Sequence, residues 1–97
     1  MRFDWDENKA AANEAKHGVS FDEAQEAFDD PNCAEGFDAA HSDEETRFWL
    51  IGLSSRRLLT VVYAERQENV IRLISAREAT ARERKMYESS GEERDDF

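Results

Sequence analysis

The sequence is poor in the residues that build disulfides, tight turns and phosphate loops: its 97 residues include one cysteine, one proline and four glycines. The single thiol, Cys33, cannot form an intrachain disulfide or a thiolate metal cluster. Nothing around it marks a nucleophile, so we interpret it as a passive, partly buried side chain. The glycines form no phosphate-binding loop, and the chain has neither an HExxH motif nor a paired Cys/His set for zinc. We therefore expect neither a metal nor another cofactor.

Long hydrophobic runs are missing as well. No apolar stretch approaches the roughly 20 residues that a helix needs to cross a bilayer. The first residues have neither the basic segment nor the apolar stretch of a secretory signal. Since the length suits one small domain, the sequence predicts a single-domain cytoplasmic protein.

Positive charge is scarce and unevenly placed. The net charge of −10 by itself disfavours a nucleic-acid partner. However, residues 1–46 hold 14 acidic and 3 basic residues, a net charge of −11, whereas residues 47–87 hold 9 basic and 4 acidic residues, a net charge of +5. This distribution predicts two surfaces, one for a phosphate backbone and one for a basic partner.

The first part of the chain predicts a short strand and two helices. Residues 3–5 alternate between apolar and polar as in a strand. Good helix formers follow over residues 6–16, and Gly18 stands where a glycine commonly ends a helix. Ser20 and Glu23 have the spacing of a capping box, which predicts a second short helix that ends before the only proline.

The remainder predicts a sheet followed by one helix. Residues 32–46 are weakly patterned and predict a loop with one edge strand. Three apolar segments with short connections predict an antiparallel meander; they span residues 47–53, 58–65 and 70–75.

A second capping box follows the last of these strands. Ser75 and Glu78 have its spacing and predict a final helix that ends near Tyr87, and residues 89–97 predict a disordered acidic tail. The fold class is therefore α+β, with two N-terminal helices, an antiparallel meander and one C-terminal helix in a domain over residues 1–88.

Short motifs occur in a fixed order over nearly the whole chain. Those in the first part are Phe3-x-Trp5-Asp6, Asn13-x-x-Lys16-His17-Gly18-Val19-Ser20-Phe21 and Phe28-x-Asp30. Those in the second part are Glu45-x-Arg47-Phe48, Tyr63-x-Glu65-Arg66, Ile71-Arg72-Leu73-Ile74-Ser75-Ala76-Arg77, Ala79-Thr80 and Glu83-Arg84-x-x-Tyr87. Together they resemble the BrnT toxins. The resemblance implies a RelE-like fold, RNA cleavage without a metal, and neutralisation by a partner antitoxin, BrnA, which binds DNA and represses its own operon.

Four arginines are candidates for stabilising charge on RNA phosphate, because a guanidinium pairs bidentately with phosphate and stays protonated. Arg72 lies between apolar strand residues, where a charge must be paired or face a cleft. We predict it as catalytic, and a salt bridge with Glu65 or another strand neighbour is the alternative. Arg77, in the first turn of the predicted helix, would form a phosphate-binding corner with the helix amides, or be an ordinary solvated side chain. Arg66 is a further catalytic candidate and Arg47 an RNA-binding one, although each can equally be an ordinary exposed residue.

The candidates for proton transfer are His17 and Glu65, with Glu45 and Tyr63 as further choices, while His41 lies in an acidic loop and is not expected to take part. Imidazole is the side chain type that titrates near neutrality. However, a histidine next to Gly18 also suits the negative end of a helix dipole, so a structural role for His17 stays open.

Other residues are candidates for contacts with RNA outside the reaction centre. Tyr63 could stack on or position a base, and Arg84 and Lys85 could bind the backbone or form a solvated helix face. Phe48 and Trp49 have the strand spacing of core residues rather than of base-stacking platforms.

The sequence thus predicts the endoribonuclease toxin of a bacterial type II toxin–antitoxin system. RNA would be its substrate, cut by attack of the 2′-hydroxyl, and a dimeric BrnA-like antitoxin its partner. The alternative is a non-catalytic or degenerate binding module that acts only in an operon-regulating complex. The acidic first half favours this alternative, since such a surface can dock a basic partner.

Overall fold

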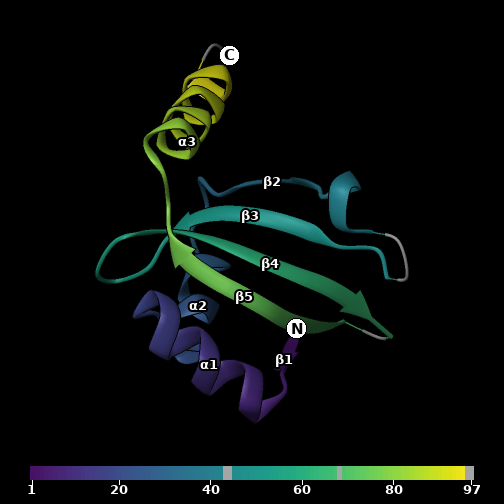
Figure 1. Ribbon diagram of the computed structural model, residues 1–97. Helices are drawn as coiled ribbons and strands as arrows, with labels where there is room; N and C mark the ends of the chain where they lie inside the picture. Colours follow the sequence, from purple (N-terminus) through teal and green to yellow (C-terminus); the bar gives the residue numbers. More distant parts are fainter. Residues whose placement is uncertain (43–44, 68, 96–97) are drawn as a thin grey trace.

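The computed structural model describes residues 1–42, 45–67 and 69–95. Its centre is a five-stranded sheet with helices on both sides (Figure 1). The strand order is β1-β5-β4-β3-β2, in which β1 runs parallel to β5 and the other neighbours are antiparallel. The predicted α+β class is confirmed. The elements in chain order are β1 (Arg2–Asp4), α1 (Glu7–His17), α2 (Phe21–Ala27), β2 (Ala34–Phe37), the short 3-10 helix η1 (Ala39–His41), β3 (Phe48–Leu53), β4 (Leu58–Arg66), β5 (Val70–Glu78) and α3 (Ala81–Asp95).

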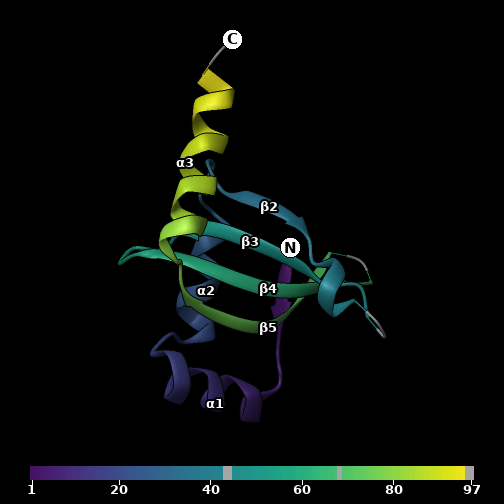
Figure 2. The ribbon, with the colours of Figure 1, turned by 45° about the horizontal axis from the view of Figure 1, so that its top comes forward.

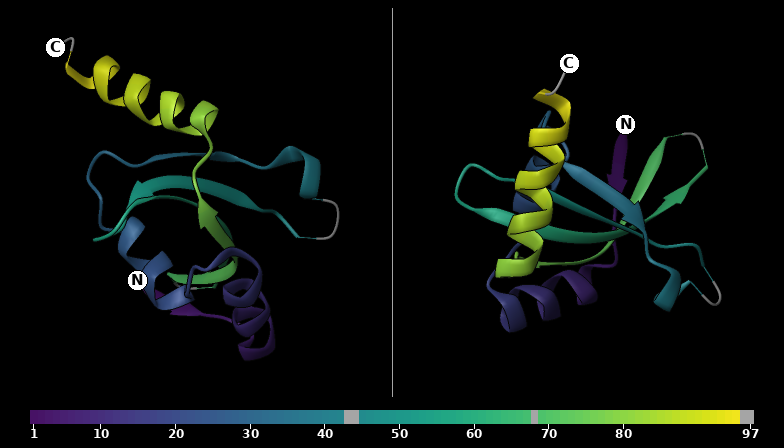
Figure 3. Two further views of the ribbon diagram at one scale, coloured as in Figure 1. Left: turned by 60° about the vertical axis from the view of Figure 1, so that its left-hand side comes forward. Right: turned by 90° about the horizontal axis from the view of Figure 1, so that it is seen from above.

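The two faces of the sheet are covered differently. Helices α1 and α2 lie against one face and α3 lies on the other (Figure 3). Alternate residues of the strands point to α1 and α2 and form the hydrophobic core, which contains Val19, Phe21, Leu50, Leu59, Val61 and Leu73 among others. We call the opposite side the open face. Helix α3 packs on it mainly at β3 and β2 and then extends away from the sheet (Figure 2).

Helix α1 lies within one residue of the helix predicted over residues 6–16 and ends before Gly18 as predicted. The Asp6 carboxylate accepts hydrogen bonds from the backbone N–H groups of Asn8 and Lys9, which satisfies donors that have no partner within the helix. Gly18 ends the helix in the left-handed region, at φ 69°, where a side chain would be strained.

The side-chain amide of Asn13 joins α1 to the sheet. Its Nδ2 donates to the carbonyl groups of Val19 and Ala76 at 3.0 and 2.8 Å, and its Oδ1 accepts from the Ala76 N–H at 3.1 Å. β1 pairs with β5 only from Val70 to Arg72, so the edge of β5 beside Ala76 lies beyond that strand. The amide of Asn13 takes the place of a neighbouring strand there, because it satisfies both backbone groups of Ala76 in the interior.

The start of α2 corrects one detail of the predicted capping box. The Ser20 hydroxyl accepts from the Glu23 N–H at 3.0 Å, as predicted. The Glu23 carboxylate does not return to Ser20; it accepts from Arg57 Nε and Nη2 at 3.0 and 2.8 Å and from the Ser54 hydroxyl. Hydrogen bonds from Arg57 lower the pKa of this buried carboxyl. Glu23 therefore joins α2 to the β3–β4 hairpin rather than closing its own helix end.

The predicted start of the last helix at Ser75 is wrong. β5 continues to Glu78, since Thr60 pairs with Arg77 and Leu59 with Glu78. The helix starts after Thr80, whose hydroxyl accepts from the Glu83 N–H while Glu83 accepts from the Thr80 N–H, at 3.1 and 2.9 Å. Residues 75–78 and 80–83 have the same capping-box spacing. Residues 75–78 pair with β4 as part of β5, so only residues 80–83 begin the helix.

The C-terminal end also differs from the prediction. α3 runs to Asp95, so its end near Tyr87 was placed too early and no break separates residues 88 and 89. Residues 96–97 of the predicted tail, and Glu68 of the predicted β4–β5 connection, lie outside the described residues. The edge strand predicted within residues 32–46 is confirmed as β2.

We expect Asn13→Ala to lower the free energy of unfolding by about 3 kcal/mol, since it leaves an N–H and two carbonyl groups buried without partners. Asn8→Ala, in the exposed first turn of the same helix, is the matched control and should change it by less than about 0.5 kcal/mol. Urea denaturation measures both values. Equal stability of the two variants would contradict the role of Asn13.

Candidate active site on the open face

Arginines gather on the open face. Paired residues of neighbouring strands point to the same side, and the register aligns Arg2 with Val70, Asp4 with Arg72, Ala64 with Arg72, and Thr60 with Arg77. These pairings place all the arginines of β1, β4 and β5 on the side away from α1 and α2. The open face therefore carries the four arginines predicted from the sequence, Arg47, Arg66, Arg72 and Arg77. It also carries Arg2, which the sequence did not single out. We call these five residues the arginine row.

A β-bulge keeps two of these arginines on one face. Val62 pairs with Ser75 and Tyr63 with Leu73, so Ile74 is an extra residue in β5. Arg72 and Arg77 are five positions apart, and a regular strand would turn them to opposite faces. The extra residue restores the alternation, so both side chains reach the open face.

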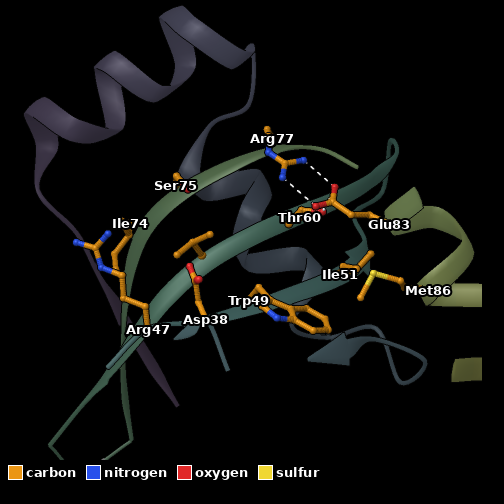
Figure 4. Close-up of a pocket in the computed structure, with 11 residues that line it drawn as sticks. Asp38, Arg47, Trp49, Ile51, Thr60, Ile74, Ser75, Arg77, Glu83 and Met86 are labelled. Carbon is orange, nitrogen blue, oxygen red and sulfur yellow. Dashed lines mark hydrogen bonds and ion pairs between the residues drawn. The ribbon is translucent and has the colours of Figure 1, made fainter. Parts of the chain in front are cut away.

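A pocket of about 400 Å³ lies between this arginine row and α3 (Figure 4). Its walls are mostly apolar, and Arg47 and Arg77 stand at its margin. The lining residues are Asp38, Arg47, Trp49, Ile51, Thr60, Val62, Ile74, Ser75, Arg77, Glu83 and Met86. A second, wider depression on the same face is lined by Arg2, Asp4, Arg66, Gln67, Val70 and Arg72.

Arg77 and Glu83 form a bidentate ion pair beside the pocket. Nη1 and Nη2 of Arg77 donate to the two carboxylate oxygens of Glu83 at 2.7 and 2.8 Å (Figure 4). Glu83 also accepts from the Thr60 hydroxyl and the Thr80 N–H. These donors, Arg77 foremost, lower the pKa of Glu83 to about 2, and the same pair raises the pKa of Arg77. Arg77 therefore holds a carboxylate in the geometry in which it would hold a phosphate.

Carboxylates also accompany two other arginines of the row. Arg72 lies 3.4 Å from Asp4 of β1 and Arg66 lies 2.6 Å from Glu45. The alternative of a salt bridge to a strand neighbour thus holds for Arg72, with Asp4 rather than Glu65 as the partner. Each of these arginines still exposes about a third or more of its side chain, so the pairs lie in solvent and an incoming phosphate can compete with them.

Arg47 differs from these three. Its Nε is buried and finds no hydrogen-bond partner among the described atoms, while its carbonyl oxygen accepts from the Asp38 N–H at 2.8 Å. A buried donor without a partner is costly. Arg47 therefore brings to the margin of the pocket a guanidinium group whose buried Nε is not satisfied by the described residues.

Two predicted proton-transfer residues lie away from this site. Glu65 pairs with Ile71, a core residue, so its side chain starts on the face that α1 and α2 cover. His17 is the last residue of α1, which packs on that same side (Figure 3). The structure brings neither residue to the arginine row, and the position of His17 agrees with the structural alternative at a helix end.

Tyr63 belongs to the core rather than to an RNA surface. It is 3% exposed, its ring stacks on Phe48 with centroids 5.6 Å apart, and its hydroxyl donates to Glu35 at 2.8 Å. Burial, with the hydrogen bond to Glu35, raises its pKa. A ring this buried cannot stack on a base, so the predicted contact with RNA does not fit the structure.

Helix α3 presents the last predicted candidates and two residues that the sequence analysis missed. Arg84 and Lys85 are exposed on its first turns. Glu83 and Met86 point to the sheet and line the pocket. The sequence signal that could have indicated Glu83 is the capping box of residues 80–83, which ends at this residue. Trp49, predicted as core, also lines the pocket, because α3 leaves most of the open face uncovered.

The family model of the ribonuclease toxin BrnT of type II toxin–antitoxin systems matches residues 5–83, most of the chain. The chain belongs to this family. The BrnT-family chain is thus a ribonuclease toxin of a type II toxin–antitoxin system, a class that acts on RNA and has an antitoxin partner. Among solved structures, it is similar to the ribonuclease toxin BrnT of Brucella abortus, with a TM-score of 0.61 and 24% identity over 82% of this chain and 97% of the other. This likeness shows the fold. No curated protein sequence matches the chain.

The described part of this BrnT-family chain has neither a cluster of metal-binding side chains nor a membrane-spanning helix. No three His, Cys, Asp or Glu side chains in it lie together so that they could hold a metal ion. None of its described helices is long and apolar enough to span a membrane.

We expect the Arg77–Glu83 pair to make stability depend on acid pH. The pKa of Glu83 is depressed from 4.5 to about 2, so its contribution is complete above about pH 4.5 and is lost as the pH falls toward 2. Glu83→Gln should remove this dependence, whereas Glu78→Gln, an exposed residue at the same capping-box position, should retain it. Thermal unfolding between pH 2 and 6 measures the difference. Parallel pH profiles for all three proteins would contradict the pair.

Proposed function

We propose that the open face cleaves RNA by attack of a ribose 2′-hydroxyl on the adjacent phosphate, without a metal. The observation that carries the proposal is the arginine row on one sheet face beside a pocket. Guanidinium groups stabilise the negative charge that builds on the phosphoryl oxygens during such an attack. An RNA strand laid across the row would meet arginines from β1, β5 and β4 in turn.

Arg72 and Arg77 are too far apart to bind the same phosphate. Arg72 and Arg77 are separated by roughly 15 Å along β5, more than one phosphate can bridge. Arg77 adjoins the pocket and Arg72 the wider depression. We assign the scissile phosphate to Arg77, while Arg72 and Arg66 bind the neighbouring backbone.

Glu83 is the carboxylate placed to accept the 2′-hydroxyl proton. The hydrogen bonds from Arg77 are the main reason for its low pKa. When phosphate takes over Arg77, Glu83 loses those bonds and becomes a stronger base. The bond from the 2′ oxygen to phosphorus then forms, the bond to the 5′ oxygen breaks, and the departing oxygen takes a proton from water.

The antitoxin partner that we propose is a BrnA-like, DNA-binding dimer, and the toxin would act in the cytoplasm. Family membership supports an antitoxin. The helical layer opposite the arginine row is suited to a basic partner, because acidic residues outnumber basic ones among its exposed side chains. They include Glu7, Glu14, Asp22, Glu26 and Asp29.

The ion pairs of the row favour one alternative, a toxin fold that only binds its partner. Arg66, Arg72 and Arg77 each contact a carboxylate, and such pairs weaken RNA binding if phosphate does not displace them. Growth arrest on expression without antitoxin separates the two functions: arrest supports the ribonuclease, and harmless expression of folded protein supports the binding module.

We expect Arg77→Ala to slow RNA cleavage by about 10²- to 10³-fold, since it removes a donor to the transition state. Arg72→Ala should act mainly on RNA binding, and the double variant should abolish growth arrest and RNA fragmentation. Arg56→Ala, which removes an exposed arginine of the β3–β4 hairpin, is the matched control. Full toxicity of the double variant would contradict the proposal.

We expect Glu83→Gln to tighten RNA binding and still slow cleavage by about 10²-fold or more, since it frees Arg77 but removes the base. Glutamine retains the capping geometry at the start of α3, so the fold should persist. Single-turnover cleavage and binding, measured separately, test this split. Faster cleavage by the variant would show that Glu83 only masks Arg77.

A further inference from the structure

The pocket beside Arg77 has the properties of a site for one flat aromatic ligand. We propose that it binds a single unstacked nucleobase of the RNA strand, with the adjoining phosphates on Arg77 and Arg47. The inference rests on the proposed function, since it names the part of the RNA that the active site recognises.

The size and lining of the pocket agree with a nucleobase. Its volume of about 400 Å³ lies at the small end of the roughly 300–1,000 Å³ of ligand sites, which are mostly apolar with a few polar groups. Ile51, Val62 and Ile74 offer apolar surface for the ring faces. Thr60 and Ser75 are polar side chains in the same lining and can meet the hydrogen-bonding edge of a base.

Trp49 supplies the aromatic wall and is fixed in place before any ligand binds. It pairs with Gly36 of β2, and a Cβ atom at Gly36 would overlap the indole ring. The indole therefore lies directly on the β2 backbone, in a position that only glycine permits. A ring fixed in this way can stack on a base at little entropic cost.

Helix α3 provides the facing side of the pocket. Met86 reaches from α3 toward Trp49 and Ile51 (Figure 4). A thioether is polarisable and packs well against aromatic rings. Trp49 and Met86, brought together from β3 and α3, form the apolar end of the pocket, while Arg47 lies at its other end.

The charges at the margin distinguish a nucleotide from an apolar protein side chain. Arg77 can bind a phosphate in place of Glu83. Arg47 carries a buried Nε with no partner among the described atoms. A nucleotide would fill the apolar cavity and also bring phosphate to the guanidinium groups of Arg77 and Arg47, whereas an apolar side chain of the antitoxin would bring no anion to either.

Tryptophan fluorescence tests the proposal directly. The chain has two tryptophans, and Trp5 contacts Phe21 in the α1–α2 layer, so Trp5→Phe leaves Trp49 as the only reporter. The probes are a short RNA with 2′-O-methyl riboses, which 2′-hydroxyl attack cannot cleave, and an abasic oligomer of the same backbone and length. We expect the RNA to quench Trp49 and to bind about tenfold more tightly than the abasic oligomer, which should bind without quenching.

The outcomes separate this inference from the proposed function. Equal affinity of the two oligomers without quenching would overturn the base site while leaving backbone binding intact. Binding of neither oligomer would overturn both. Quenching by the RNA in a chain that cleaves no substrate would retain the base site and refute the ribonuclease mechanism.

Two variants at exposed residues, which should leave folding unchanged, complete the test. Met86 is 40% exposed, so Met86→Ala should fold and should lower the affinity for the RNA several-fold with no effect on the abasic oligomer. Leu53→Ala, an exposed apolar residue of the same face outside the pocket, should change neither affinity. An equal loss for both oligomers on Met86→Ala would show that Met86 acts on α3 rather than on a base.

Discussion

The ladder between β4 and β5 extends from the pair Leu59–Glu78 to the pair Arg66–Val70, and both functional surfaces depend on it. It turns Leu73 toward the helical layer and Arg72 and Arg77 toward the open face. The bulge at Ile74 keeps the two arginines on one side. The outer edge of β5 is completed by β1 and then by the amide of Asn13, so the strand that carries the site is hydrogen-bonded on both edges.

The sheet also separates positive from negative side chains. The arginine row lies on the open face and exposed acidic residues lie on the helical layer, so the net charge of −10 does not describe either surface. Three arginines of the row hold carboxylates of the chain. These pairs reduce the repulsion between neighbouring guanidinium groups, and on the proposed function RNA would compete with internal anions for each arginine. The candidate active site thus combines a surface suited to phosphate with partners that a phosphate would have to displace.

Much of the fold could be predicted from local pattern. The cap at Asp6, the glycine at the end of α1, and the apolar segments of β3 and β4 all depend on neighbours in sequence. The start of the last helix could not be predicted, because residues 75–78 and 80–83 present the same capping signal. Pairing of Thr60 with Arg77 decides between them, and that contact joins segments far apart in the chain. The same limit applies to Tyr63, whose place in the core depends on Phe48 and Phe28.

The sequence by itself determined which residues could bind phosphate and that they lie in one segment, because charge and residue type are local properties. It named Arg47, Arg66, Arg72 and Arg77. The tertiary structure decided which partners accompany them: it brought Glu83 and Trp49 to the pocket and left His17 and Glu65 on the other side of the sheet. The physical reason is that strand register and the path of α3 depend on contacts between distant segments, which no local pattern specifies.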